Sequence, residues 1–184
     1  MDDYQFPDGI TFDKFIGNIL TINGIAVTIT DILSEKLQPD FNERRGVFQG
    51  LTTQNNTVIL RNYGISELSD RRQSLGLVLR ENFEDEHKAL SACQGINTVP
   101  RLFAVDELVQ AASDPFPNGY LRAIVMSRAR GQSVVDIFDD LDQQDYTTIH
   151  TQLTAALEHM RLNGYVFIEP PTEHIFYEKS TSRM

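Results

Sequence analysis

The 184-residue chain is acidic, with 26 Asp and Glu residues against 16 Lys and Arg residues and a formal net charge of −10. This balance argues against nucleic acids and anionic membranes as partners, because both are bound by basic surfaces. No stretch of the sequence reaches the roughly 18 apolar residues that cross a bilayer. The single cysteine, Cys93, excludes an internal disulfide and suits a reducing compartment. We therefore expect a cytoplasmic globular protein.

The first third of the chain is predicted to form two β-hairpins. Four strands are expected, at residues 18–22, 25–30, 46–52 and 57–63. The first two flank Asn23-Gly24, the dipeptide that best accepts the positive φ angles of a type I′ turn. The last contains the apolar run Val58-Ile59-Leu60, which is typical of a strand covered on both faces. Residues 31–45 are mixed and polar and predict no element.

A long helix is predicted at about residues 74–94. Five residues recur at spacings of four, three, four and three along one stripe, and they are Leu79, Phe83, Glu86, Leu90 and Cys93. Cys93 on this stripe favours a buried structural thiol over a nucleophile activated by histidine. Glu86 is the one charged residue on this otherwise apolar stripe, and charged residues are rarely buried without a partner. It is either solvated or paired with a cation.

The remaining elements follow in chain order. Strands are predicted at 99–105 and 120–126, a connector at 127–131, and helices at 133–141 and 146–162. Asn163-Gly164 is a suitable C-terminal stop for the second helix, and residues 165–177 contain strand-like pieces. The order predicts an α+β protein in which a sheet lobe precedes a helical lobe.

Residues 45–184 resemble the protein kinase-like superfamily, in which a strand lysine contacts phosphates and pairs with a glutamate of the next helix. The corresponding strand here is Thr57-Val58-Ile59-Leu60-Arg61, with Arg61 in place of the lysine. Glu86 matches the helix glutamate. The resemblance implies an ion pair between Arg61 and Glu86, the degenerate remnant of a nucleotide site. Arginine is bulkier and less mobile than lysine at a phosphate.

The segment that resembles the catalytic loop keeps its spacing and loses most of its chemistry. Phe167 replaces the histidine, and Glu169 replaces the catalytic aspartate. His174 replaces the metal-binding asparagine, and imidazole is a poor ligand for magnesium, which prefers hard oxygen atoms. The glycine-rich loop is replaced by Asn42-Glu43-Arg44-Arg45-Gly46, and no D-F-G strand follows. The resemblance therefore implies a pseudokinase.

The resemblance implies a β-rich N-lobe at residues 1–126 with one long helix, followed at 127–184 by a hinge and a shortened helical C-lobe. We expect a binding or regulatory module without phosphotransferase activity, cofactor or metal. Such a shortened lobe would expose apolar surface to a protein partner or a second copy, and a small-molecule ligand could bind in the interlobe cleft.

Two alternatives to a pseudokinase stay open. An enzyme could reuse the interlobe cleft, with Glu169 and His174 as an acid–base pair acting on a small molecule. The chain could instead be a fragment of an active kinase or small-molecule phosphotransferase that binds ATP and magnesium.

Two further clusters predict no metal site. The four histidines lack the i, i+4 spacing of a helical zinc site. The aspartates between Asp136 and Asp145 lack the glycine and the terminal glutamate of a calcium loop, which favours a solvated helix end.

Overall fold

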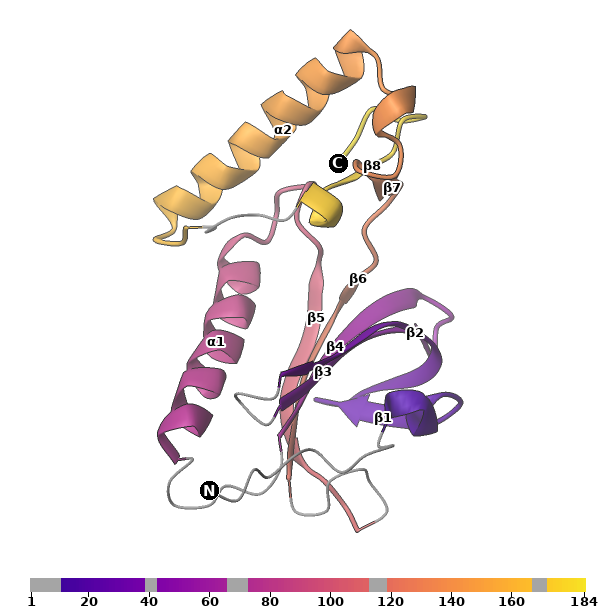
Figure 1. Cartoon of the computed structure of the whole chain (residues 1–184), viewed down its shortest axis with the longest axis vertical. Coiled ribbons are helices and arrows are strands. Elements are labelled where there is room, and N and C mark those ends of the chain that lie inside the picture. Colours follow the sequence, from indigo (N-terminus) through magenta and orange to yellow (C-terminus); the bar gives the residue numbers. More distant parts are fainter. Residues whose placement is uncertain (1–10, 39–42, 66–72, 113–118, 167–171) are drawn as a thin grey trace. The chain divides into compact units, whose positions relative to one another are not determined.

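The computed structural model describes residues 11–38, 43–65, 73–112, 119–166 and 172–184 (Figure 1). Internal contacts divide the chain into two units, which are treated separately. The sheet unit contains Met1–His87 and Leu102–Ser127, and the second unit contains Lys88–Arg101 and Arg128–Met184.

The sheet unit is built on one antiparallel sheet. Its six strands are β1 (Ile19–Ile22), β2 (Ile25–Gln38), β3 (Glu43–Thr52), β4 (Thr57–Ile65), β5 (Leu102–Val109) and β6 (Tyr120–Ser127). They are ordered β1-β2-β3-β4-β6-β5. The two ends of this order approach each other, because the Asn23 backbone N–H donates to Asp106 Oδ2 of β5 at 2.9 Å. The sheet is therefore nearly closed and barrel-like (Figure 1).

The turn residues explain both N-terminal hairpins. Asn23 and Gly24 have φ angles of 44° and 79°, as a type I′ turn requires, and Ile22 pairs with Ile25. Asn55 has a φ of 58° at the tip of the β3–β4 hairpin. Both predicted hairpins are confirmed. Strand β2 continues to Gln38, through a segment for which the sequence predicted no element.

The interior of the sheet is filled with side chains. It is lined by Ile22, Val27, Ile29, Phe48, Val58, Leu60, Ala104, Leu121, Ala123 and Val125. The 3-10 helix η1 (Phe12–Phe15) inserts Phe12 and Phe15 into this core, where each ring contacts that of Phe48. The Phe12 N–H donates to Glu35 Oε1 at 2.9 Å, and Glu35 also pairs with Arg44. The interior of this sheet is therefore occupied by side chains.

Helix α1 (Gln73–Ala92) lies close to the predicted range of 74–94, and the two predicted strands after it are present as β5 and β6. The part of α1 up to His87 belongs to the sheet unit. Phe83 and Cys93 on the predicted stripe are buried. The apolar periodicity therefore identified this helix correctly.

The second unit contains the helix α2 (Gln143–Leu162) and little other regular structure. Its short elements are β7 (Gln132–Ser133), η4 (Phe138–Asp140), η5 (Thr172–His174) and β8 (Phe176–Tyr177). Strand β7 pairs with β8. Gly131 precedes β7 with a φ of +77°, and a Cβ there would lie 2.1 Å from the Tyr177 carbonyl oxygen, so this close approach requires glycine.

The expected fold class was wrong. The described chain is not a β-rich N-lobe followed by a helical C-lobe, because it is mostly β-structure with only two α-helices. The predicted helix at 133–141 is replaced by strand β7 and one turn of 3-10 helix. The long helix begins only after this segment, because the Asp142 carboxylate accepts hydrogen bonds from Gln144 N and Asp145 N and so caps the first turn of α2.

Candidate functional site

Arg61 and Glu86, the two residues that the sequence singled out, form an ion pair inside the sheet unit. Arg61 pairs in register with Val47 and Ile124, while the next residue along, Leu60, belongs to the core. Because successive side chains in a strand alternate between faces, Arg61 lies on the outer face, where Glu86 of α1 meets it. The predicted ion pair is confirmed, and its assignment to a nucleotide site stays a prediction.

Two further ion pairs lie on the same outer face. Arg45 lies on β3 two residues before Val47, the β3 partner of Arg61, so its side chain is on the same face as that of Arg61. The Arg45 Nε donates to Glu43 Oε2 at 2.6 Å. Arg122 Nε donates to Glu107 Oε2 at 2.6 Å between adjacent strands. We call these two pairs, together with Arg61–Glu86, the outer charged cluster. The members are Glu43, Arg45, Arg61, Glu86, Glu107 and Arg122.

Part of the outer charged cluster is deeply buried. Glu43 is 1% exposed and Arg122 is 5% exposed. Within the described residues, Glu43 Oε1 and Arg122 Nη1 are buried without a hydrogen-bond partner. Burial raises the pKa of the Glu43 carboxyl, although the charges of Arg45 and Arg122 pull that pKa the other way. Removal from water thus outweighs the nearby cations.

The accessible part of the cluster is the side where a ligand could bind. The side chains of Arg45 and Arg61 are 38% and 39% exposed, against 23% for Glu86. Three arginines and three carboxylates balance one another in charge, and the cluster contains no hydroxyl or thiol nucleophile. The arrangement suits recognition of polar groups on a partner better than covalent chemistry.

The predicted acid–base pair of Glu169 and His174 stays a prediction. Glu169 lies outside the described residues. His174 is the last residue of η5 and is exposed.

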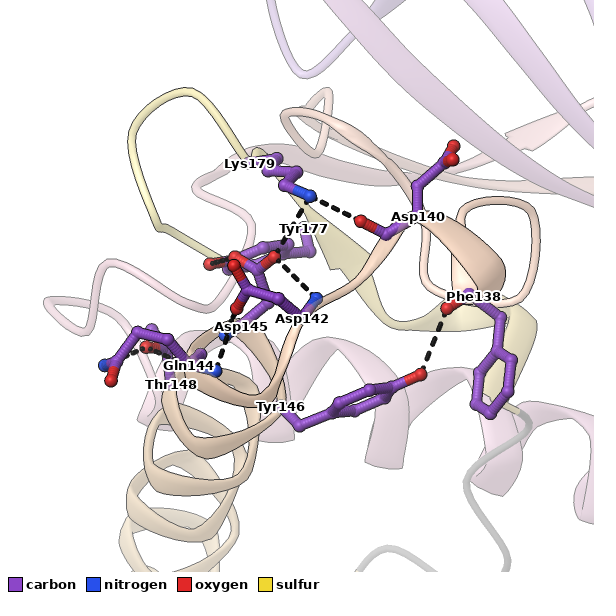
Figure 2. A network of polar contacts seen from close by, with 9 residues as sticks. All are labelled: Phe138, Asp140, Asp142, Gln144, Asp145, Tyr146, Thr148, Tyr177 and Lys179. Atoms are coloured by element: carbon purple, nitrogen blue, oxygen red, sulfur yellow. Dashed lines mark hydrogen bonds and ion pairs between the residues drawn. The ribbon is translucent and has the colours of Figure 1, made fainter.

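A network that the sequence analysis missed lies in the second unit, at the start of α2 (Figure 2). The Tyr177 hydroxyl donates to Asp145 Oδ1 at 2.8 Å, and the Asp142 N–H donates to Asp145 Oδ2 at 3.1 Å. Lys179 Nζ lies 3.3 Å from the same Oδ2 and also donates to the Asp140 carbonyl oxygen. We call Asp140, Asp142, Asp145, Tyr177 and Lys179 the cap network. The spacing from Asp142 to Asp145 is the capping-box signal that could have revealed it.

The cap network differs from the outer charged cluster in its electrostatics. The Tyr177 hydroxyl is the main cause that lowers the pKa of Asp145, followed by the Asp142 N–H, with Lys179 adding to both. Burial, together with the Asp145 charge, raises the pKa of Tyr177. The network therefore holds a charged carboxylate and a neutral phenol, and it ties the β8 hairpin to the first turn of α2.

Three other candidates fall short of a site. A pocket of about 260 Å³ in the second unit is lined by Asn97, Thr98, Gln152, Arg183 and Met184. The Gln152 amide is already bonded to Ser182 O and Met184 N, at 2.8 and 2.9 Å. Cys93 is buried, which raises the pKa of its thiol, as a structural cysteine would show. The described part of the chain contains no cluster of three potential metal ligands.

No helix in the described ranges combines the length and the apolar character needed to cross a membrane. No family model and no curated protein matches this sequence. The relation to the protein kinase-like superfamily therefore stays a prediction.

Proposed function

We propose that this protein is a binding or regulatory module and that it does not transfer phosphoryl groups. The observation that carries the proposal is the mutual pairing of the outer charged cluster, in which every arginine is engaged by a carboxylate. A phosphoryl-transfer site needs cationic groups directed at phosphate, where they offset the charge of the transition state. Here three carboxylates offset the three arginine charges, so the cluster presents no net positive charge to a phosphate.

Arg61 is the residue that distinguishes a working nucleotide site from a structural pair. Its planar guanidinium group forms a fixed fork, and Glu86 already occupies part of it. In a kinase-like site the lysine makes the corresponding pair and still contacts phosphate, so the pair alone does not separate the two cases and the Arg61 substitution has to test them. The proposal keeps the Arg61–Glu86 pair from the kinase-like resemblance and does not keep the kinase-like fold.

The ligand class that this function implies is a protein partner in the cytoplasm. The filled interior of the sheet leaves the surface of that unit for recognition. The lone buried Cys93 and the acidic composition fit a cytoplasmic location.

The test is a thermal-shift titration of the 184-residue chain with ATP, with and without magnesium. A ligand that binds only the native state raises the melting midpoint once its concentration exceeds its Kd. We expect no magnesium-dependent shift up to millimolar ATP, and no release of phosphate. Arg61→Ala and Arg161→Ala are run in parallel, since Arg161 lies in an exposed ion pair with Glu158 in the second unit.

A magnesium-dependent shift that disappears in Arg61→Ala and persists in Arg161→Ala would contradict the proposal. That pattern would identify a functional nucleotide site at the Arg61–Glu86 pair. Turnover of ATP lost only in Arg61→Ala would contradict it as well.

A further inference from the structure

The second unit exposes apolar side chains in the segment between β7 and α2. Val135 is 51% exposed and Phe138 is 57% exposed. The Phe138 and Tyr146 rings lie edge to face, with centroids 5.7 Å apart and an interplanar angle of 65°. Figure 2 shows the two rings side by side, with the Tyr146 hydroxyl donating to the Phe138 carbonyl oxygen at 3.0 Å. We call Phe138 and Tyr146 the aromatic patch.

The aromatic patch is held in place from behind. Ile137, next to Phe138, is buried against Ile149 and Tyr177. Asp142 caps α2 four residues before Tyr146, and Lys179 bonds the Asp140 carbonyl oxygen. The exposed Phe138 ring and the half-buried Tyr146 ring are therefore held in place by the turn and the start of α2. Little conformational entropy would be lost when a partner binds them.

Exposed carboxylates flank Phe138 in the sequence. Asp136, Asp139 and Asp140 are exposed, and within the described residues their carboxylates make no hydrogen bond or ion pair. Asp142 and Asp145 are already used by the helix cap, and Lys179 is bound to Asp145. The segment thus combines uncovered rings with uncompensated negative charge.

We propose that the aromatic patch is a docking surface for an arginine-bearing segment of a partner protein. The choice of occupant follows from charge complementarity. A purely apolar segment would cover the rings and add nothing to offset the negative charge of this acidic segment, while a guanidinium group can contact a ring and pair with a carboxylate. Its flat face stacks on an aromatic ring, and its edge donates in a fork to a carboxylate. Lysine offers a point charge and lacks this flat face.

This inference gives the proposed binding module a partner class, and it rests on the proposed function only to that extent. Its residues belong to the second unit, while the pair that the ATP titration tests belongs to the sheet unit. The two proposals can therefore fail separately.

The experiment measures binding of a short fluorescent peptide of alternating arginine and glycine by anisotropy, at near-physiological salt. A lysine–glycine peptide of the same length is the comparison probe. We expect the wild-type chain to bind the arginine peptide more tightly. Phe138→Ala should weaken this binding about tenfold, the loss typical of an aromatic hot spot. Asp139→Asn/Asp140→Asn should weaken it and reduce its salt dependence.

Two controls separate a site from general attraction to an acidic protein. The double variant Asp13→Asn/Asp85→Asn removes two exposed charges from the sheet unit and should leave affinity unchanged. Leu162→Ala removes an apolar side chain that is 70% exposed at the end of α2 and should also have no effect.

Three results would overturn the docking surface. They are an unchanged affinity in Phe138→Ala, an equal loss in the two charge doubles, and no binding of either peptide by the wild-type chain. None of these bears on the ATP titration. A positive ATP result beside normal peptide binding would instead contradict the proposed function and leave the docking surface in place.

Discussion

The outer charged cluster of the sheet unit and the cap network of the second unit use similar groups in opposite ways. Each places a buried carboxylate among hydrogen-bond donors. In the cap network, the Asp145 carboxylate accepts hydrogen bonds from the Tyr177 hydroxyl and a backbone N–H and pairs with Lys179, and these contacts lower its pKa. In the outer charged cluster, Glu43 has an arginine on one oxygen and nothing on the other among the described residues, and its pKa rises.

The comparison shows that the effect of a buried polar network on structure and stability depends on how many of its polar atoms have hydrogen-bond partners, rather than on how many ion pairs it contains. A fully bonded network fixes one geometry, as the cap network does for the start of α2. A partly bonded one keeps charged groups out of water without full compensation, which costs stability. Such a site is retained where a function requires it more often than where only stability is needed.

The largest expected effect comes from breaking the outer charged cluster at Arg122. Replacing Arg122 with Met leaves Glu107 without its ion-pair partner and removes a positive charge that acts on Glu43. Removing one partner of a buried pair costs about 3–5 kcal/mol, so we expect a loss near the lower figure at neutral pH. Urea unfolding monitored by circular dichroism measures it. Much of the loss should be recovered as the pH is lowered, because protonation removes the charge of Glu43, whose pKa is raised by burial.

The matched control is Arg161→Met, because Arg161 forms an exposed pair with Glu158 that lies in water. We expect it to be close to wild type. An Arg122→Met chain as stable as Arg161→Met would show that the buried cluster carries no more weight than a surface pair.

The next effect comes from removing the hydroxyl of Tyr177 in the cap network. Tyr177→Phe leaves the ring in place and deletes the donor at 2.8 Å, which should cost about 1–2 kcal/mol. Tyr146→Phe is the control, because it removes a hydroxyl bonded to a carbonyl oxygen on an exposed turn. Thermal melts of both variants measure the difference. Equal melting temperatures would mean that the cap network contributes nothing beyond ordinary surface hydrogen bonds.

The pH dependence of stability should have opposite signs at the two carboxylates. The raised pKa of Glu43 means that its charged form is disfavoured by folding, so wild type loses stability relative to Glu43→Gln as pH rises above 4.5. The lowered pKa of Asp145 means that its contribution is complete above 3.8 and is lost as pH falls through the folded value. Urea unfolding across this range for wild type, Glu43→Gln and Asp145→Asn measures both.

Parallel pH profiles for the two variants would contradict this assignment. They would place both carboxylates in equivalent environments, against the difference in their bonding.

The local elements could be predicted from the sequence, and the way they combine could not. Asn23-Gly24 fixed the first hairpin, and the apolar stripe through Phe83 and Cys93 identified α1, because both signals act over a few residues. The extension of β2 to Gln38 depends on pairing with β3, and its polar residues carry no periodic signal. That pairing, and the return of β1 towards β5, made the sheet larger than expected and the fold mostly β.

The candidate site also contains some features that could be predicted from the sequence and others that could not. The Arg61–Glu86 pair was predicted from the resemblance to the protein kinase-like superfamily, whereas Arg122 and Glu107 gave no signal. Their pairing arises from the register of β5 against β6, which a single sequence does not reveal. Tyr177 and Asp145 are 32 residues apart and meet only because β8 returns to the start of α2.

The smallest effect tests the accessible end of the outer charged cluster. Arg61 and Glu86 are partly exposed, so their coupling should be about 0.5–1 kcal/mol, well below the effect of Arg122→Met. A double-mutant cycle with Arg61→Ala, Glu86→Ala and the double variant isolates this term from other effects of each substitution. Added salt should reduce the coupling, because an accessible pair is screened. A coupling as large as the Arg122 effect, and insensitive to salt, would place Arg61 in the buried part of the cluster and remove it as a contact for any partner.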